Sequence, residues 1–341
     1  MATIKDVAKR AGLAISTVSA VVNRSAPVSE DAIERVERAI AEVGYVPHGA
    51  ARSLRSGRSQ LIGLVVPNIA NPHFAAVARA VENVCLARGY TSVVFSTGQD
   101  AARESQVLTI MRVQRVAGLI VIPTRSDAEH GANLIHQIHV PTVLLDMFVE
   151  GLPYNVIKTD NVEAGRLATE HLLSLGHRRI GIILGIPGLA TSDDRHAGYL
   201  KAFRDRGLES DPALALPGQF DQSEAYNAAL DLLELPKRPT AIVAISNMMT
   251  MGLLFALRKL KFSVPLDVSV VGIDDLEFGE ILDPRPTVVA TPILDMAKRS
   301  IDLLLTQIES GDAAAPMTEV WTPKLVVRES AAPPTDAALK S

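Results

Sequence analysis

The chain has 341 residues, 48% of them hydrophobic, and a formal net charge of −4. This length exceeds that of one small domain, so we expect two or three domains. Cys85 is the only cysteine, which excludes an intramolecular disulfide framework and suits a reducing compartment. The first residues include Asp6 and lack an apolar segment, so we expect no signal peptide, and no run of about 18 apolar residues predicts a membrane span.

Charge is unevenly distributed along the chain. Residues 1–60 carry nine basic and six acidic side chains, a net of +3, whereas the remainder has a net of −7. A basic head on an acidic body favours a localised contact with nucleic acid by the head.

The head predicts three short helices. Thr3 precedes an apolar stripe and suits a helix cap, and Gly12 breaks that first helix. A second helix is expected at about 15–23, and a third begins after Ser29 and ends at Gly44. Helix, glycine turn and short helix is the pattern of a helix-turn-helix, although a generic three-helix bundle has the same spacing.

In a helix-turn-helix the second helix lies in the major groove with its first residues towards the base edges. Its apolar residues Val18 and Val22 point inward, so we expect Ile15, Ser16, Ser19 and Ala20 to face outward. The short polar side chains on and beside this face suit phosphate oxygens, and they are Ser16, Thr17, Ser19 and Asn23.

From residue 61 onward, short apolar runs alternate with helical segments. The runs that predict strands are Leu61–Pro67, Thr91–Thr97, Gly118–Thr124, Thr142–Met147, Val156–Asp160, Arg179–Gly185, Ala241–Ser246, Val268–Asp274 and Lys324–Arg328. Near-continuous apolar strands between helices indicate parallel sheets covered on both faces. This number of strands exceeds a comfortable single sheet, so we expect an α/β fold with two doubly wound lobes.

Several segments closely resemble those of the lactose-repressor/galactose-repressor (LacI) family, in order and at the family's spacing. They are Thr3–Asn23, Gly44–Pro47, Ala51–Ser59, Ile62–Pro67, Asn71–Phe74, Gly176–Ile180, Arg195–Tyr199 and Val268–Asp275. The resemblance spans about residues 3–330. It implies a cytoplasmic DNA-binding transcriptional regulator that acts as a homodimer, with repression as the family default and activation as the alternative.

The resemblance also implies a domain plan. An all-α helix-turn-helix DNA-binding domain would occupy residues 1–46, a hinge with its own helix 47–60, and a periplasmic-binding-protein-like effector-binding and dimerisation domain 61–330. The amino-terminal lobe would take about 61–160 and 292–323, and the carboxyl-terminal lobe about 161–291 and 324–330. Residues 331–341 predict a disordered tail, and they carry no leucine heptad of the kind that makes some relatives tetrameric.

In such a head, Ile15, Ser16 and Ala20 occupy the base-reading positions, and Leu54 holds the place of a hinge leucine that wedges into a minor-groove step. Ala20 stands where arginine is usual, and Ala14 stands where a serine cap is usual. Since alanine offers only a methyl group to a base, we expect an operator that lacks the family's arginine-read guanine. The candidate DNA-contacting residues are Thr3, Ile15, Ser16, Thr17, Ser19, Ala20, Asn23, Arg52 and Leu54.

Two doubly wound lobes suit a small ligand at the carboxyl ends of their strands. The positions that the resemblance assigns to the cleft are Asn71, His73, Phe74, Asp146, Arg195, Phe220, Asn247 and Asp274. Carboxylates accept hydrogen bonds from hydroxyl groups, arginine and asparagine donate hydrogen bonds, and a phenyl ring packs on the apolar face of a pyranose. These residue types predict a sugar or sugar derivative, while an acidic sugar or a purine stays open because Met248 and Thr291 depart from common family residues.

Two other classes of function compete with this interpretation. A sugar-binding transport protein would have a similar body, but we expect no signal peptide and the head predicts DNA binding. An α/β enzyme is disfavoured because the sequence lacks a Walker loop, a G-x-S-x-G elbow, an H-E-x-x-H motif and a strand-linked G-x-G-x-x-G. We therefore predict no catalytic residues, no metal site and no cofactor, with operator DNA, a small-molecule effector and a second copy of the chain as partners.

Overall fold

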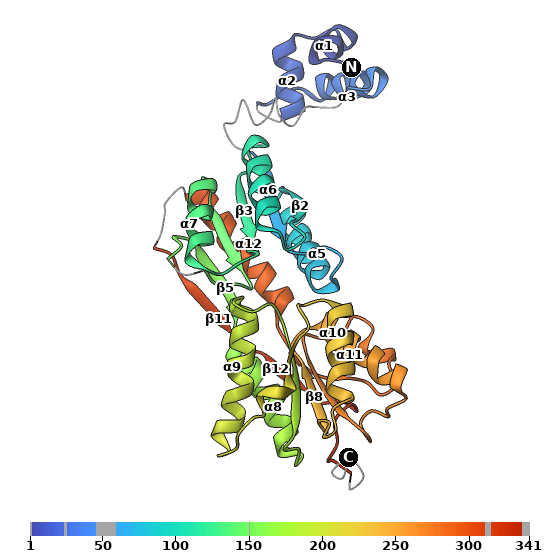
Figure 1. Ribbon diagram of the computed structural model, residues 1–341. Coiled ribbons are helices and arrows are strands. Elements are labelled where there is room, and N and C mark those ends of the chain that lie inside the picture. Colours follow the sequence, from blue (N-terminus) through green and yellow to red (C-terminus); the bar gives the residue numbers. More distant parts are fainter. Residues whose placement is uncertain (1, 24–25, 46–58, 150, 311–314, 336–341) are drawn as a thin grey trace. The chain divides into compact units, whose positions relative to one another are not determined.

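The computed structural model describes residues 2–23, 26–45, 59–149, 151–310 and 315–335. These residues form two compact units, divided after residue 60 (Figure 1). Most of the predicted hinge, including Arg52 and Leu54, lies outside the described residues.

The first unit contains the three predicted helices: α1 (Ile4–Ala11), α2 (Ile15–Asn23) and α3 (Glu30–Val43). The Asp6 carboxylate accepts a hydrogen bond from the backbone N–H of Thr3 at 2.8 Å, which completes the cap of α1. At the other end of α1, the Arg35 guanidinium on α3 donates to the carbonyl of Ala11 at 2.8 Å. Val7, Val18 and other small side chains from the three helices form one buried core within this unit.

The amino-terminal lobe of the second unit, called the N-lobe below, is a six-stranded parallel sheet in the order β11-β5-β4-β3-β1-β2. Its strands are β1 (Leu61–Val66), β2 (Thr91–Ser96), β3 (Gly118–Val121), β4 (Thr142–Leu145), β5 (Asn155–Thr159) and β11 (Thr318–Trp321). Its helices are α5 (Pro72–Ala87), α6 (Ala101–Val113), α7 (Ala128–Gln137) and α12 (Ile293–Ser310). Separate cores on the two faces, one under α5 and α12 and one under α6 and α7, explain why its central strands are continuously apolar.

The carboxyl-terminal lobe, the C-lobe, has a second six-stranded sheet in the order β12-β10-β9-β8-β6-β7. Its strands are β6 (Ile180–Leu184), β7 (Ala215–Pro217), β8 (Ala241–Ala244), β9 (Ser269–Ile273), β10 (Thr287–Ala290) and β12 (Lys324–Val326). Its helices are α8 (Asn161–Ser174), α9 (Ala190–Asp205), α10 (Gln222–Leu233) and α11 (Asn247–Leu260), with short 3₁₀ turns η1 (Pro212–Leu214) and η2 (Gly279–Ile281). All pairings are parallel except that of β12 with β10.

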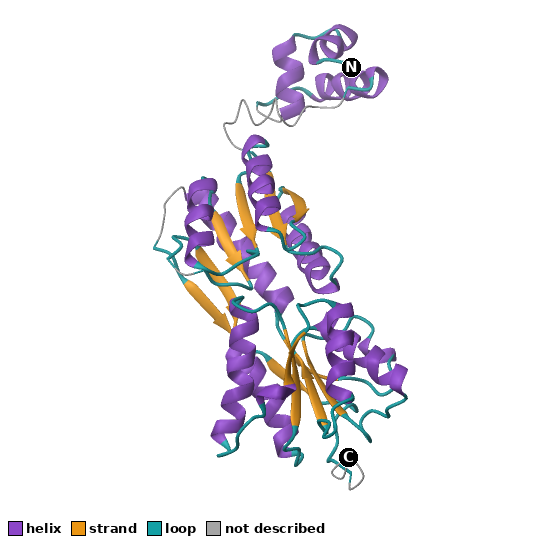
Figure 2. Ribbon diagram, viewed as in Figure 1, coloured by secondary structure: helices purple, strands orange, loops and turns teal. Residues whose placement is uncertain are grey.

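Each lobe is a sheet between layers of helices, as Figure 2 shows. The chain passes between the two sheets three times: after β5, after β10 and after β11. The two-lobed α/β fold predicted from the sequence is therefore confirmed. Within the described residues, no helix is both long and apolar enough to cross a membrane.

Two details of the sequence prediction are wrong. The strands β7, β10 and β11 were not predicted; each has three or four residues, and β11 lies half-exposed at the sheet edge. The first residues of the predicted disordered tail are ordered: the N–H of Ala332 donates to the Ser269 hydroxyl at 3.1 Å, and its carbonyl accepts from His177 Nε2 at 2.9 Å. These hydrogen bonds from side chains to the backbone hold Ala332 on the C-lobe, and 336–341 lie outside the described residues.

Candidate functional site

The first turn of α2 is the accessible part of the predicted DNA-reading helix. Ile15 is 46% exposed, Ser16 is exposed, and Thr17 and Ala20 are half-buried. Thr3 is also exposed, at the start of α1. An exposed apolar side chain beside hydroxyl groups is a surface that can meet both base edges and phosphates.

The expectation that Ser19 faces outward is wrong. Ser19 is only 6% exposed, because α2 packs against both α1 and α3 and its buried arc spans the adjacent positions Val18 and Ser19. Asn23 is the last residue of α2, and its side chain lies outside the described residues, as do Arg52 and Leu54.

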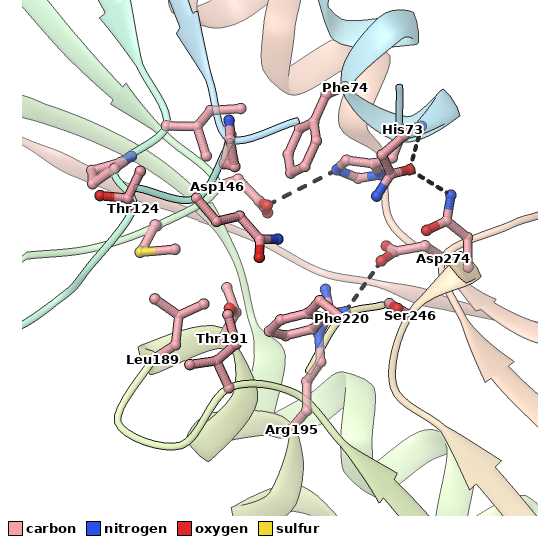
Figure 3. A pocket seen from close by; sticks show the side chains of 18 residues that line it. His73, Phe74, Thr124, Asp146, Leu189, Thr191, Arg195, Phe220, Ser246 and Asp274 are labelled. Carbon is pink, nitrogen blue, oxygen red and sulfur yellow. Dashed lines mark hydrogen bonds and ion pairs between the residues drawn. The ribbon is translucent and has the colours of Figure 1, made fainter. Parts of the chain in front are cut away.

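In the second unit, one pocket lies between the lobes at the carboxyl ends of both parallel sheets (Figure 3). It brings together all eight residues that the sequence assigned to a cleft: Asn71, His73, Phe74, Asp146, Arg195, Phe220, Asn247 and Asp274. Ten further residues line the pocket and were not predicted from the sequence: Pro67, Gln99, Ile122, Pro123, Thr124, Met147, Ile186, Leu189, Thr191 and Ser246.

Both pocket carboxylates follow the end of a strand. Asp146 comes directly after β4 and Asp274 directly after β9, and both have a left-handed backbone, with φ of 66° and 65°. Non-glycine residues rarely adopt this conformation, and aspartate is among the few that tolerate it. The turn halts each strand where its side chain enters the pocket, and such strain is typical of functional sites.

On the C-lobe side, the guanidinium of Arg195 is fixed by the protein itself. Arg195 is 3% exposed, and its Nε donates to Asn161 Oδ1 at 2.9 Å. Its Nη1 donates to the Ile245 carbonyl at 2.5 Å and to Asp274 Oδ2 at 3.1 Å. Thr291 donates to the other oxygen of Asp274 at 2.9 Å. The charge of Arg195 is therefore balanced before any ligand arrives.

The pKa of Asp274 reflects this arrangement. Burial alone raises the pKa, but the charges of Arg195 and His73 and the hydrogen bonds from Thr291 and Arg195 outweigh burial, so the pKa lies below its ordinary value. Asp274 is held as a carboxylate.

The position of Arg195 depends on close contact between α8 and α9. A Cβ atom at Gly165 of α8 would lie 2.0 Å from the carbonyl oxygen of Arg195. Only glycine permits this approach, which brings the Arg195 side chain within reach of Asn161 at the start of α8.

On the N-lobe side, the Asp146 carboxylate lacks such partners. The residue is 8% exposed, and the basic side chain beside it is His73, whose Nε2 lies 3.9 Å from Asp146 Oδ2. Burial raises the pKa of Asp146 above its ordinary value, although the charges of His73 and Arg195 oppose this shift. This carboxylate is well placed to accept a hydrogen bond from a donor group of a ligand.

Two phenyl rings face the pocket from opposite lobes, Phe74 from α5 and Phe220 from the loop before α10 (Figure 3). Phe220 has a left-handed backbone with φ of 55°. A Cβ atom at Gly185, directly after β6, would lie 2.3 Å from the Phe220 ring. The ring can therefore occupy this position only because residue 185 is glycine. The two rings provide apolar faces for a flat or ring-shaped ligand.

Two sets of hydrogen bonds join the lobes at the pocket. Asn247 Nδ2 of the C-lobe donates to Asn71 Oδ1 of the N-lobe at 2.9 Å. The hydroxyl of Ser126, in the N-lobe, donates to the carbonyl of Gly188 at 3.1 Å and accepts from the N–H of Ala190 at 2.9 Å. These contacts depend on the angle between the lobes, so they exist only while the lobes are close.

Some of the unnamed lining residues lie at strand ends, as the two aspartates do. Thr124 and Ser246 follow β3 and β8 closely, so the strand-end argument reaches them. Leu189 and Thr191 lie around the start of α9, several residues past β6. Their sequence carries no polar pattern that indicates a pocket.

Comparison with known proteins agrees with both units. Residues 3–48 match the model of the bacterial regulatory proteins, lacI family, and residues 169–331 match a periplasmic binding protein-like domain. The HTH-type transcriptional repressor PurR of Pectobacterium carotovorum subsp. carotovorum (strain PC1) is 34% identical over 333 residues, covering 97% of each chain. The ribose operon repressor of Halalkalibacterium halodurans is 35% identical over 331 residues, also covering 97% of each chain.

Solved structures lead to the same family. The Lac repressor dimer bound to operator and the anti-inducer ONPF has a TM-score of 0.85 at 28% identity, covering 97% of this chain and 99% of that one. The transcriptional regulator CelR–cellobiose complex has a TM-score of 0.72 at 30% identity, covering 97% and 100%. From its helical head, its two-lobed body and these near full-length matches, the chain belongs to the lacI family of bacterial regulatory proteins.

Proposed function

We propose that the chain is a transcriptional repressor whose binding to operator DNA is controlled by a sugar or sugar derivative in the interlobe pocket. The observation that carries this proposal is the presence, in one chain, of a helix-turn-helix unit and a pocket built from the strand ends of two lobes. Relatives named as repressors, and a neighbour solved as a dimer on operator with an anti-inducer, support it.

The eight predicted pocket residues would bind the effector. Asp146 and Asp274 accept hydrogen bonds from hydroxyl groups, Asn247 and Arg195 donate hydrogen bonds, and Phe220 packs on an apolar ring face. The ribose operon repressor among the relatives and the cellobiose complex among the neighbours support a sugar. A flat heterocycle such as a purine is the second candidate, because Phe74 and Phe220 face the pocket from opposite lobes.

In the head, we propose that Ile15, Ser16 and Ala20 meet base edges, and that Thr3, Thr17 and Asn23 meet phosphates. In the hinge, Arg52 would contact the DNA backbone and Leu54 would enter the minor groove. The buried Ser19 would instead stabilise the packing of α2.

We also propose that the protein is a homodimer, since two heads are needed to read two related half-sites. In the N-lobe, Ile69 and Val94 are exposed beside a shallow hollow over α5 and β2. In the C-lobe, Phe255 of α11 and Ile281 of η2 are exposed, by 46% and 81%. Figure 1 shows α5 and α11 on the same side of the second unit. Exposed apolar residues of this kind favour contact with a second copy.

We infer that the protein works in the cytoplasm, where its DNA target lies, and that the pocket binds its ligand without converting it. The relatives named as repressors support this inference. Recovery of unchanged sugar after prolonged incubation with the protein is the expected result, and turnover would contradict it.

The direct test is selection of operator sequences from random DNA with the full chain, followed by measurement of their affinity with and without sugars. We expect a selected sequence to be bound specifically, and one sugar to change that affinity by about tenfold or more. Failure to select any sequence would contradict the proposed function.

The hinge proposal has its own test. Leu54→Ala is expected to weaken binding to the selected operator by about tenfold or more, because the wedge stabilises a kink that only the specific complex contains. Binding to random DNA should change little. Fluorescence anisotropy with both DNAs measures this, and an equal loss on both would exclude the wedge.

A further inference from the structure

The pocket has no surplus of positive charge. Among the residues that line it, the ionisable side chains are Asp146, Asp274, Arg195 and His73. With both carboxylates ionised, the four side chains sum to zero if His73 is protonated and to −1 if it is neutral. The one permanent cation, Arg195, is already bound to Asp274 and to protein oxygens. For a negatively charged ligand, the lining residues therefore offer no permanent cation that is not already paired within the protein. The ligand would also be repelled by the Asp146 carboxylate.

Three helices, α5, α9 and α11, begin at the pocket, and free amides at helix N-termini are the usual alternative for binding an anion. In two of them the amides are occupied. Asn71 Oδ1 accepts from the N–H of His73 at 3.0 Å at the start of α5. Ser246 Oγ accepts from the N–H of Met249 at 3.2 Å at the start of α11. These caps remove donors that a phosphate would need.

The third helix, α9, is capped from the other lobe. Its own cap residue is Leu189, whose side chain cannot accept a hydrogen bond. Ser126 of the N-lobe supplies the missing acceptor to the N–H of Ala190. Beside it, the carboxylate of Asp193 accepts from the N–H of Gly188 at 3.3 Å. The start of α9 is therefore already supplied with acceptors, one of them an exposed carboxylate that is not among the lining residues.

We propose that the pocket binds an uncharged ring compound and excludes the phosphorylated or carboxylated forms of the same ring. A neutral sugar is the compound expected from the proposed function. This inference deepens the proposed function and rests on it. Asp146 accepts a hydrogen bond from a hydroxyl group, the Phe74 and Phe220 rings cover the apolar faces, and neither contact compensates the desolvation of an added negative charge.

The experiment is isothermal titration calorimetry of the full chain with matched compounds. The pairs are D-ribose and ribose 5-phosphate, D-glucose and glucose 6-phosphate, and D-glucose and glucuronate, and the panel also holds adenine and hypoxanthine. Methyl glucuronate, which is uncharged but larger than glucuronate, separates charge from size. For each neutral compound that binds, we expect its anionic partner to bind at least about 100-fold more weakly.

The outcomes separate this inference from the proposed function. An anionic compound that binds as tightly as its neutral parent overturns the inference, and so does a panel in which no uncharged sugar or base binds. Binding of an uncharged base in place of a sugar supports the inference and overturns the sugar assignment. Failure of the proposed function itself shows separately, as failure to select an operator.

Two variants locate the source of the exclusion. Asp146→Asn is expected to narrow the gap in affinity between glucose and glucuronate by about tenfold, because the carboxylate that repels glucuronate is removed. Asp231→Asn, at an exposed position of α10, makes the same change in net charge far from the lining residues and should leave the gap unchanged. Equal effects of the two variants would overturn the inference, since the exclusion would then come from the overall charge.

Discussion

The two walls of the pocket differ in how completely their charges are satisfied. On the C-lobe wall, Arg195, Asp274 and Thr291 form a closed network with the backbone. On the N-lobe wall, Asp146 is equally buried but has only His73, at 3.9 Å. The difference indicates that the C-lobe half is organised in advance, while the N-lobe half is completed by the ligand. Closure of the lobes then depends on what the ligand offers to Asp146.

The largest expected effect comes from breaking the C-lobe network. Arg195→Leu leaves Asp274 buried without its cation, and loss of one partner of a buried pair costs about 3–5 kcal/mol. Urea unfolding of the variant should show this loss. The double variant Arg195→Leu with Asp274→Leu should recover much of it, because no buried charge remains. Wild-type stability of the single variant would show that the network is not closed in solution.

The two aspartates should affect stability in opposite directions with pH. A group with a raised pKa, such as Asp146, stabilises the fold most below the ordinary aspartate value of 3.8 and loses that contribution as the pH rises. Asp274, whose pKa is lowered, contributes above 3.8 and loses its contribution as the pH falls.

At neutral pH and without ligand, Asp146→Asn should therefore raise the free energy of unfolding and Asp274→Asn should lower it, each by about 1–3 kcal/mol. Both differences should shrink in acid. Urea unfolding across the pH range measures both differences. If the two variants changed the free energy of unfolding in the same direction, the proposed difference between the two pocket walls would be contradicted.

The smallest expected effect on ligand affinity comes from the hydrogen bonds that join the two lobes. Ser126→Ala removes the hydrogen bonds to Gly188 and Ala190, at a cost of about 1 kcal/mol in the closed form. Ligand affinity should fall by about fivefold, and Ser126→Thr should retain it. Ser174→Ala, which removes an exposed hydroxyl bonded within its own helix, is the matched control. Loss of affinity in the control but not in Ser126→Ala would contradict a role in closure.

The family resemblance supplied all eight pocket residues that were predicted from the sequence, Arg195 and Phe220 among them. Strand geometry supports Asp146 and Asp274, because parallel strands end at one edge of a sheet and apolar runs reveal where those strands end. Neither argument could show that Arg195 is internally paired, because that depends on the approach of α9 to Gly165 across helix packing.

Other features were out of reach because they depend on contacts between distant segments. Ser126 caps a helix in the other lobe, and no local pattern around it indicates this. Ser19 was assigned to the wrong face because the second helix has two packing partners, which widens its buried arc beyond that of a helix with one. Ala332 was assigned to a disordered tail because the tail is Ala- and Pro-rich, yet its backbone N–H donates to the hydroxyl of Ser269.

The central claim is that the pocket and the DNA-binding head are coupled. It is tested most directly by measuring the affinity of the bound sugar for the free protein and for the protein saturated with its selected operator. Linkage requires operator DNA to change sugar affinity by the same factor as the sugar changes operator affinity. We predict equal factors of about tenfold or more. The same sugar affinity with and without operator would contradict the account.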